Sequence, residues 1–195
     1  LYMYMEEADS KSSQDRILEN KKSIRDAEMS TDSLYTFDDN NSEAAKNQQG
    51  ENTSVGVFNG KGYRHGEKNT GWFSYDLKID PTAEKNYLNC TYYSGDKGRT
   101  FDVYVNGQKL KTVTINTAAG TNTFYVDTTE IPAEYLTEGS DTITVKFQAI
   151  PRRNSYVGGL FGISTSSSTA YDTDASLAAL SFDKGTMTPA YDKDT

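Results

Sequence analysis

The sequence has one cysteine, Cys90, and one histidine, His65, among its 195 residues. A single cysteine excludes an internal disulfide and any zinc site built from several cysteines. A single histidine leaves one candidate imidazole base, and no Gly-x-Ser-x-Gly segment precedes a predicted helix, so nothing supports a nucleophilic triad. No run of about 18 apolar residues occurs. We therefore expect no membrane insertion.

Basic residues are fewer than acidic ones: the chain has 20 Lys and Arg and 28 Asp and Glu, which gives a net charge of −8 and an isoelectric point near 4.7. Nucleic acids and anionic lipids are bound through clustered Lys and Arg, so neither is an expected partner. A neutral or basic ligand suits this charge better. The acidic runs Asp38-Asp39 and Asp172 to Asp174 lack the Asp-x-Asp-x-Asp-Gly spacing of a calcium loop, and the sequence locates no metal site.

Apolar residues suffice for one core and are unevenly distributed, with 35% hydrophobic and 12% aromatic residues overall. Residues 1 to about 50 are polar and have few strand signals. Within them, residues 12–29 place Ile17 and Ile24 on a narrow apolar stripe, which predicts an exposed helix. We predict that residues 1–30 are the tail of a preceding module and a linker helix, and that irregular structure follows.

Strand patterns begin at about Val55. In "GWFSYDLKID", the apolar residues from Phe73 to Ile79 alternate with polar ones, as expected of a strand with one buried face. The dipeptide Asn106-Gly107 favours the positive φ angles of a tight hairpin turn. Further strands are predicted around the apolar residues Leu88, Cys90, Tyr92, Phe101, Val103, Val105, Phe124, Val126, Ile143, Val145 and Phe147, and in the segment "GGLFGIST".

Six or more short strands separated by Gly, Asn and Asp turns, with little helix among them, are typical of an antiparallel β-sandwich. We predict a jelly roll over residues 31–164. The Ser- and Thr-rich residues 165–174 are predicted to be a linker. Residues 175–195 are too short to bury a core alone, and we predict that they are the first strand of a following domain.

Three groups of segments occur in order: "NGKGYRHGEKNTGWFSYDLKID", "YYSGDKGRTFDVYVNGQKL", and "DTITVKFQAI" with "GGLFGIST". Through them, the region from about Glu28 to Ser164 resembles the C-terminal β-sandwich of bacterial enzymes in the β-L-arabinofuranosidase class of glycoside hydrolases. Its overall character is also similar to galactose-binding-like carbohydrate modules. Residues 175–195 resemble the opening of cadherin-like β-sandwich repeats in surface proteins of Gram-positive bacteria.

The resemblance implies a secreted or cell-surface module of a multidomain enzyme, with an adjacent catalytic domain in the same polypeptide. In that family, hydrolysis resides in an α-helical barrel, where a cysteine nucleophile lies among zinc ligands. Cys90 instead falls inside a predicted strand, so we expect a small buried core residue and a chain that is not itself an enzyme. No cofactor is required, although jelly-roll carbohydrate modules often hold a structural calcium, and the resemblance permits one here.

Two competing hypotheses, hydrolysis and binding, place different demands on the residues. A glycosidase of the usual kind needs two carboxylates about 5 to 10 Å apart, and the sequence singles out no such pair. We therefore predict no catalytic residue. Binding is favoured, because continued alternation would place Trp72 beside Ser74 and Asp76 on the face of its strand that points away from the core.

An exposed indole can stack on a sugar ring while polar neighbours bond to the hydroxyl groups. The loop "GYRHGEKNT", just upstream of Trp72, supplies such neighbours. The candidate ligand-binding residues are Trp72, Arg64, His65 and Tyr63, with Arg99 as a further addition. Each has a competing structural interpretation: Trp72 covering an end of the sandwich, Arg64 paired with Asp76 or Glu67, His65 in a turn, and Arg99, like Arg152 and Arg153, as solvated surface charge.

We therefore predict a carbohydrate-binding or substrate-positioning module that accompanies a glycoside hydrolase acting on plant or host glycans. An arabinose- or galactose-containing glycan is the expected ligand. The alternative is a structural module without a ligand, which packs against the catalytic domain and spaces it from later domains.

Overall fold

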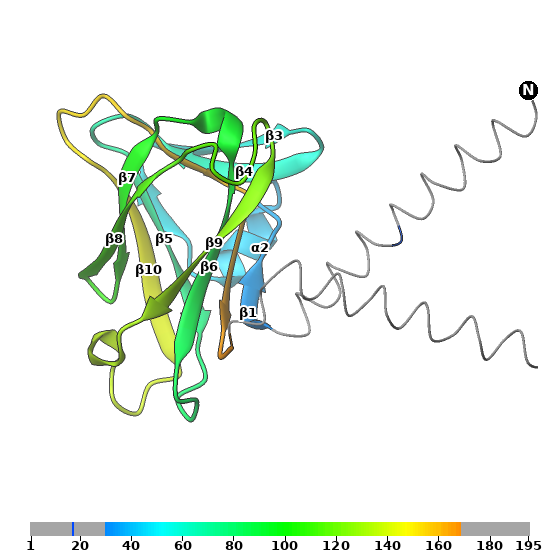
Figure 1. Cartoon of the computed structure of the whole chain (residues 1–195). Helices are drawn as coiled ribbons and strands as arrows, with labels where there is room; N and C mark the ends of the chain where they lie inside the picture. Colours follow the sequence, from blue (N-terminus) through cyan, green and yellow to red (C-terminus); the bar gives the residue numbers. More distant parts are fainter. Residues whose placement is uncertain (1–16, 18–29, 169–195) are drawn as a thin grey trace, which may run out of the picture. The chain divides into compact units, whose positions relative to one another are not determined.

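The computed structural model describes Ile17 and residues 30–168 (Figure 1). The predicted linker helix over residues 12–29, apart from Ile17, and the predicted start of a following domain at residues 175–195 lie outside the described residues, as does most of the predicted linker at 165–174. Residues 30–168 form a compact unit of short antiparallel strands.

The strands pair in three sheets, and every pair is antiparallel. The four-stranded sheet has the order β1 (Ser30–Leu34), β12 (Gly162–Ser166), β6 (Asn86–Tyr93) and β9 (Phe124–Ile131). The five-stranded sheet has the order β2 (Gln49–Glu51), β5 (Trp72–Lys78), β10 (Thr142–Ala149), β7 (Thr100–Val105) and β8 (Gln108–Thr114). The three-stranded sheet has the order β11 (Val157–Leu160), β4 (Lys61–Gly66) and β3 (Thr53–Phe58). The connections include the helix α2 (Asn40–Ala45) and the short 3-10 helices η1 (Ser94–Asp96) and η2 (Ala133–Tyr135). The predicted antiparallel β-sandwich of jelly-roll type is confirmed.

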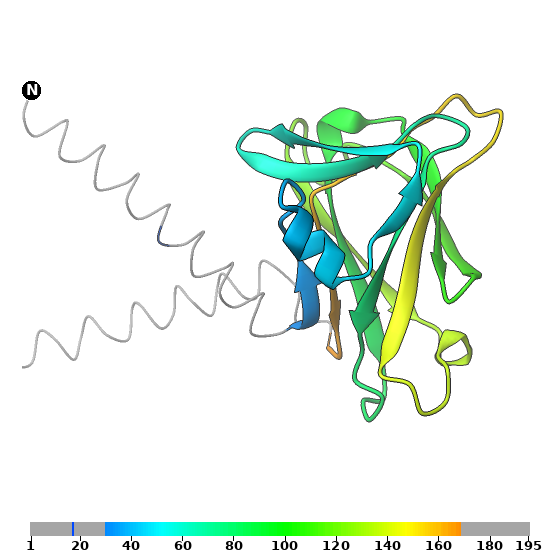
Figure 2. The same ribbon diagram turned by 180° about the vertical axis from the view of Figure 1, so that it is seen from behind.

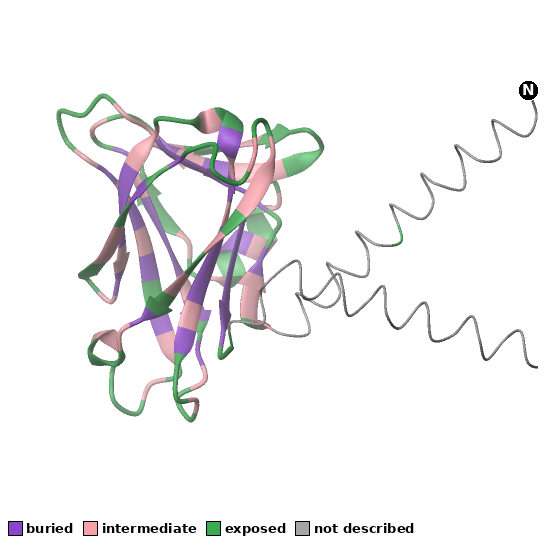
Figure 3. Cartoon of the chain, in the orientation of Figure 1, coloured by how far each residue is buried: buried purple, intermediate pink, exposed green. Residues whose placement is uncertain are grey.

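The core is built mainly by the two larger sheets, whose strands contain most of the buried residues, coloured purple in Figure 3. On β5, the predicted inward residues Phe73, Tyr75 and Leu77 have no exposed surface. The rings of Phe73 and Phe147 stack with their centroids 5.1 Å apart. A fully buried aromatic side chain contributes about 1.5–3 kcal/mol through the hydrophobic effect, so these strands account for much of the core.

Cys90 lies in this core between Leu88 and Tyr92, as the alternation of β6 predicts. Burial raises the pKa of its thiol to about 12. Because the thiolate is the reactive form, Cys90 is an inert packing residue at neutral pH.

The predicted phase of β9 is wrong. Val126 is 38% exposed, whereas Tyr125 packs against the core. Phe124 is half-buried outside that core and meets the ring of Phe161 at 4.8 Å between centroids. The run Phe124-Tyr125-Val126 is apolar at every position, so alternation cannot choose a face, and the packing of Phe124 on Phe161 decides it.

Residues 36–54, predicted to be irregular, contain α2, β2 and the start of β3, and the strand β1 just before them was not predicted. Leu34 and Phe37 reach the core, with 4% and 0% of their surface exposed. Elements this short carry little periodic signal, and their strands are held by long-range pairing of β1 with β12 and of β2 with β5. The strand β12 runs to Ser166, two residues beyond the predicted end of the domain at residue 164.

The segment "GYRHGEKNT" is not a loop, because its first half is the strand β4. The β3–β4 hairpin crosses one end of the sandwich, as the two opposite views in Figures 1 and 2 show. Alternation along β4 sends Arg64 inward, where it is buried, and leaves Tyr63 and His65 half-buried on the other face. This end of the sandwich therefore gathers several of the predicted site residues. Among the described residues, no helix is long and apolar enough to cross a membrane.

Candidate functional site

Three predicted site residues, Tyr63, His65 and Arg99, line a common hollow of about 150 Å³. They come from β4 and from the turn before β7. We call this concavity the aromatic hollow. Its lining residues are Phe58, Tyr63, His65, Tyr93, Asp96, Arg99 and Phe161.

The wall of the aromatic hollow is a set of packed rings. Phe161 meets Tyr63 at 5.3 Å and Tyr93 at 6.5 Å between centroids, and Tyr93 meets Phe58 at 4.8 Å. Gly56 on β3 faces Tyr63, and a Cβ atom there would lie 2.5 Å from the Tyr63 hydroxyl oxygen. The glycine therefore leaves the space that the tyrosine ring occupies.

Arg99 and Asp96 form the charged part of the lining. The Nη1 atom of Arg99 donates to the carbonyl oxygen of Gly158 at 2.9 Å, and its Nη2 atom lies 3.5 Å from Oδ1 of Asp96. The backbone N–H of Gly159 donates to Oδ2 of Asp96 at 3.3 Å, and the guanidinium lies 5.2 Å from the centre of the Tyr156 ring. Both charged side chains are partly exposed, at 30% and 22%, so fixed donors and acceptors remain within reach of a ligand.

His65 adds an imidazole group to the lining of the hollow, in addition to the charged groups of Arg99 and Asp96. Its Nε2 atom lies 2.7 Å from Oγ of Ser54. Burial lowers the pKa of this imidazole below its usual 6.5; the Glu67 carboxylate opposes the shift and Arg99 adds to it. His65 is therefore neutral at pH 7 and offers a ligand a hydrogen-bonding group without charge.

The lowered pKa of His65 predicts a pH dependence of stability. Below about pH 6.5, the unfolded chain takes up a proton that the folded His65 resists, so the free energy of unfolding falls with pH until the folded imidazole also protonates. H65Q should remove this component. Urea unfolding at pH 7.5 and 5.5 should show a smaller loss for H65Q than for the parent, and equal losses would contradict the assignment. Since His65 is the sole histidine, no second imidazole obscures the comparison.

Arg64 does not belong to the aromatic hollow. Its Nε and Nη2 atoms donate to the two carboxylate oxygens of Glu43, at 2.6 and 3.0 Å, and its Nη1 atom donates to Oγ1 of Thr53 at 3.1 Å. The competing interpretation as an ion-paired residue is right in kind, but the partner is Glu43 of α2 rather than Asp76 or Glu67. Arg64 thus fastens α2 to β4 from the inward side.

Trp72 lies apart from the aromatic hollow, whose lining does not include it. It is half-buried at the start of β5, on the face opposite Phe73 and Tyr75, as the alternation predicts. The ammonium group of Lys146 lies 4.5 Å from the centre of the indole ring. One aromatic face is therefore already occupied by a cation, which weakens the case for direct stacking of Trp72 on a sugar.

Four lining residues were missed from the sequence: Phe58, Tyr93, Asp96 and Phe161. A signal existed for two of them. The dipeptide Asn59-Gly60 after Phe58, with φ angles of 50° and 74°, is a hairpin signal of the same kind as Asn106-Gly107. Tyr93 follows Tyr92 on β6 and so had to face away from the core. No local pattern marks Asp96 or Phe161, which tertiary contacts alone bring to the hollow.

The structure also bears on metal binding. Within residues 30–168 and at Ile17, no group of three or more His, Cys, Asp or Glu side chains is placed to hold a metal ion. In the aromatic hollow, Asp96 is the one carboxylate among the lining residues. The site offers rings, an ion pair and a neutral imidazole, which suits recognition of an uncharged polar ligand.

No curated protein matches the chain, whereas residues 27–164 match a family of unknown function (DUF6805). A family 35 carbohydrate-binding module from an environmental isolate is similar in structure, with a TM-score of 0.47 and 16% identity over 60% of this chain and 84% of the module. For a family 35 module from Clostridium thermocellum, the TM-score is 0.47 and the sequence identity is 18%, over 61% of this chain and 91% of the module. For an exo-β-1,3-galactanase from Phanerochaete chrysosporium, solved with β-1,3-galactotriose, the TM-score is 0.47 and the sequence identity is 14%, over 68% of this chain and 28% of the enzyme. At such low scores and identities, no ligand transfers to this chain.

Proposed function

The chain belongs to a family of unknown function (DUF6805), and we propose that its β-sandwich is a non-catalytic carbohydrate-binding module. The observation that carries the proposal is the aromatic hollow, where rings and fixed polar groups line one small concavity. Of the residues proposed from the sequence, Tyr63, His65 and Arg99 form this site.

The chemistry of the hollow suits a sugar. A sugar ring presents apolar C–H groups on its faces and hydroxyl groups around its edge. The rings of Tyr63 and Phe58 offer flat apolar surface for the first. Arg99, Asp96 and His65 offer donors and acceptors for the second, and hydrogen bonds to a charged partner contribute about 1.5–3 kcal/mol each. The pairing of Arg99 with Asp96 also leaves little net charge, so a neutral sugar is the proposed ligand.

A binding role rather than hydrolysis is supported by the single carboxylate in the lining. Glycoside hydrolysis of the usual kind requires an acid and a second carboxylate on opposite sides of the scissile bond. Asp96 has no such partner among the residues that line the hollow, and it is already engaged by Arg99 and by the Gly159 N–H. The module therefore holds a glycan and leaves the bond intact.

The wider setting of this proposal follows from the sequence resemblance. The module would position an arabinose- or galactose-containing glycan for a glycoside hydrolase domain of the same polypeptide, outside the cell or on its surface. Residues 1–30 would join the sandwich of residues 31–164 to that preceding domain. Residues 165–174 would link it to a further sandwich that begins at residue 175.

Calorimetric titration of the 195-residue chain with neutral arabino- and galacto-oligosaccharides tests the function. At least one should bind, and R99A should weaken that binding by about tenfold or more, because a charged donor is lost. R99K keeps the charge but not the planar donor geometry, so it should be intermediate. R152A removes an exposed arginine outside the hollow and should bind like the parent. Equal affinities for R99A and R152A would exclude the aromatic hollow as the site.

The structural module remains the second candidate, and one observation favours it. Val55 and Val57 on the edge strand β3 are 40% and 59% exposed. Apolar side chains on an unpaired strand edge are a surface on which another domain can pack. Absence of heat with every oligosaccharide in the panel would favour this function over carbohydrate binding.

A further inference from the structure

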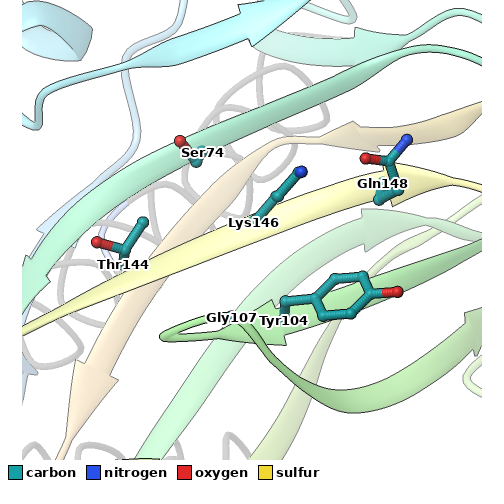
Figure 4. Close-up of a pocket in the computed structure, with 6 residues that line it drawn as sticks. All are labelled: Ser74, Tyr104, Gly107, Thr144, Lys146 and Gln148. Carbon is teal, nitrogen blue, oxygen red and sulfur yellow. The ribbon is translucent and has the colours of Figure 1, made fainter. Parts of the chain in front are cut away.

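A second concavity, of about 390 Å³, lies on the face of the five-stranded sheet that points away from the core. Ser74 on β5 and Tyr104 on β7 are the cross-strand partners of Lys146 on β10, so the three side chains lie in one row across the sheet. Figure 4 shows this row, with further β10 side chains on both sides of Lys146. We call this concavity the sheet groove, and its lining residues are Ser74, Tyr104, Gly107, Thr144, Lys146 and Gln148.

Lys146 is a cation without a counter-ion in the described part of the chain. Its ammonium group contacts the Trp72 ring at 4.5 Å, and no carboxylate oxygen of the described residues lies within 4.0 Å of it. The two nearest acidic positions on the neighbouring strands are engaged elsewhere. Asp76 accepts hydrogen bonds from Thr144 at 2.7 Å and from Asn47 at 2.8 Å. Asp102 accepts from Thr112 at 2.5 Å and pairs with Lys109 at 3.2 Å.

The groove also has unused hydrogen-bonding groups and an apolar surface. Among the described residues, the hydroxyl groups of Ser74 and Tyr104 have no hydrogen-bond partner, and the side-chain nitrogen of Gln148 makes one long contact, 3.3 Å, to the carbonyl oxygen of Ala149. The Tyr104 ring is half-buried beside Lys146. The lining contains no acidic side chain, so the groove is a locally positive site in a chain of net charge −8.

We propose that the sheet groove is a second glycan-binding site, which takes a sugar unit that carries an anionic group, a carboxylate or a sulfate. The anion pairs with the Lys146 ammonium, the sugar ring packs on Tyr104, and its hydroxyl groups bond to Ser74 and Gln148. This proposal rests on the proposed function, because it extends glycan binding from one surface to two. The two sites differ in charge, since the aromatic hollow contains a paired Arg99 and Asp96.

Trp72 provides a specific probe, because it is the sole tryptophan and it contacts the cation that would move to the anion. Titration of the 195-residue chain with trigalacturonate should change its emission in a saturable manner, whereas galactotriose should not. A sulfated galactan trisaccharide tests the second anion; binding of either acidic sugar supports the proposal and identifies the anion. An equal response to inorganic sulfate, or to galactotriose, would overturn it.

The variant K146M should weaken trigalacturonate binding about tenfold to a hundredfold, because a charged hydrogen-bond donor is lost, and K146R should stay within a few fold of the parent. K109M is the matched control, since Lys109 lies on β8, which pairs with β7 and not with β10, is outside the groove lining, and is paired with Asp102. Unaltered affinity in K146M with native far-ultraviolet dichroism would overturn the proposal.

R99A separates the two sites. If the groove binds independently, R99A loses the heat of binding neutral oligosaccharides but retains the Trp72 response to trigalacturonate. Loss of both signals in R99A would refute the groove while leaving the aromatic hollow as a site. Retention of a Lys146-dependent response in a chain that binds no neutral sugar would support the groove and contradict the hollow.

Discussion

Replacing Glu43 by Gln should lower the free energy of unfolding by about 3–5 kcal/mol, the cost of breaking a buried ion pair on one side. The Glu43 carboxylate is 3% exposed. It accepts from Nε and Nη2 of Arg64 at 2.6 and 3.0 Å, and from the hydroxyl of Tyr75 at 2.6 Å. A glutamine amide keeps one acceptor, turns an N–H₂ group toward these donors and leaves the guanidinium charge uncompensated. Urea unfolding at pH 7 measures the loss.

E67Q is the matched control for this change. The Glu67 carboxylate is 52% exposed and lies 3.9 Å from His65, so its loss should alter stability by about 0.5 kcal/mol or less. Similar effects of E43Q and E67Q would contradict the assignment of the Glu43 network as a main support of the fold. The network matters for the site because Arg64 holds β4 from the inward side, while Tyr63 and His65 line the hollow from the other side.

Replacing Phe161 by Ala is expected to lower the free energy of unfolding by about 3–5 kcal/mol, the range for deleting a buried aromatic side chain. Phe161 is 6% exposed and contacts Phe124 at 4.8 Å and Tyr63 at 5.3 Å between ring centroids. Its loss removes the support of the Tyr63 ring, so neutral oligosaccharide binding should weaken by about tenfold or more as well. Urea unfolding and calorimetric titration measure the two effects.

F58A distinguishes the two consequences of the Phe161 change. Phe58 lines the same hollow and packs on Tyr93 at 4.8 Å, but it is 39% exposed. Its loss should weaken binding while costing about 1 kcal/mol of stability. A stability loss in F161A no larger than in F58A would show that Phe161 is not a main packing residue of this end of the sandwich.

The central strands could be predicted because their sequence pattern is their packing pattern. Along β5 and β10, every second residue is apolar, and those residues fill the space between the two larger sheets. The edge strands could not be predicted in this way. The strand β2 has only three residues, too few to show an alternation. The phase of β9 depends on whether Phe124 packs on Phe161, which lies 37 positions later in the sequence.

The grouping of residues in the candidate site could be predicted only in part, for a physical reason that β4 makes clear. Tyr63, Arg64 and His65 are consecutive, so a loop would have allowed all three to reach one ligand. In a strand, consecutive side chains point to opposite faces. The Arg64 side chain therefore points to the face opposite that of Tyr63 and His65. The Asn59-Gly60 dipeptide was the available sign that this segment is the second strand of a hairpin.

By itself, the sequence determined the antiparallel β-sandwich, the inward face of its central strands and the burial of Cys90. These properties follow from local alternation and from turn residues, which act over a few positions. Only the tertiary structure decided that Arg99 and Asp96 line the same hollow as Tyr63 and His65. It also decided that Arg64 forms its ion pair with Glu43 and that the Lys146 ammonium group lies over the Trp72 ring. Each of these contacts joins different elements, and no local pattern specifies which elements become neighbours in the folded chain.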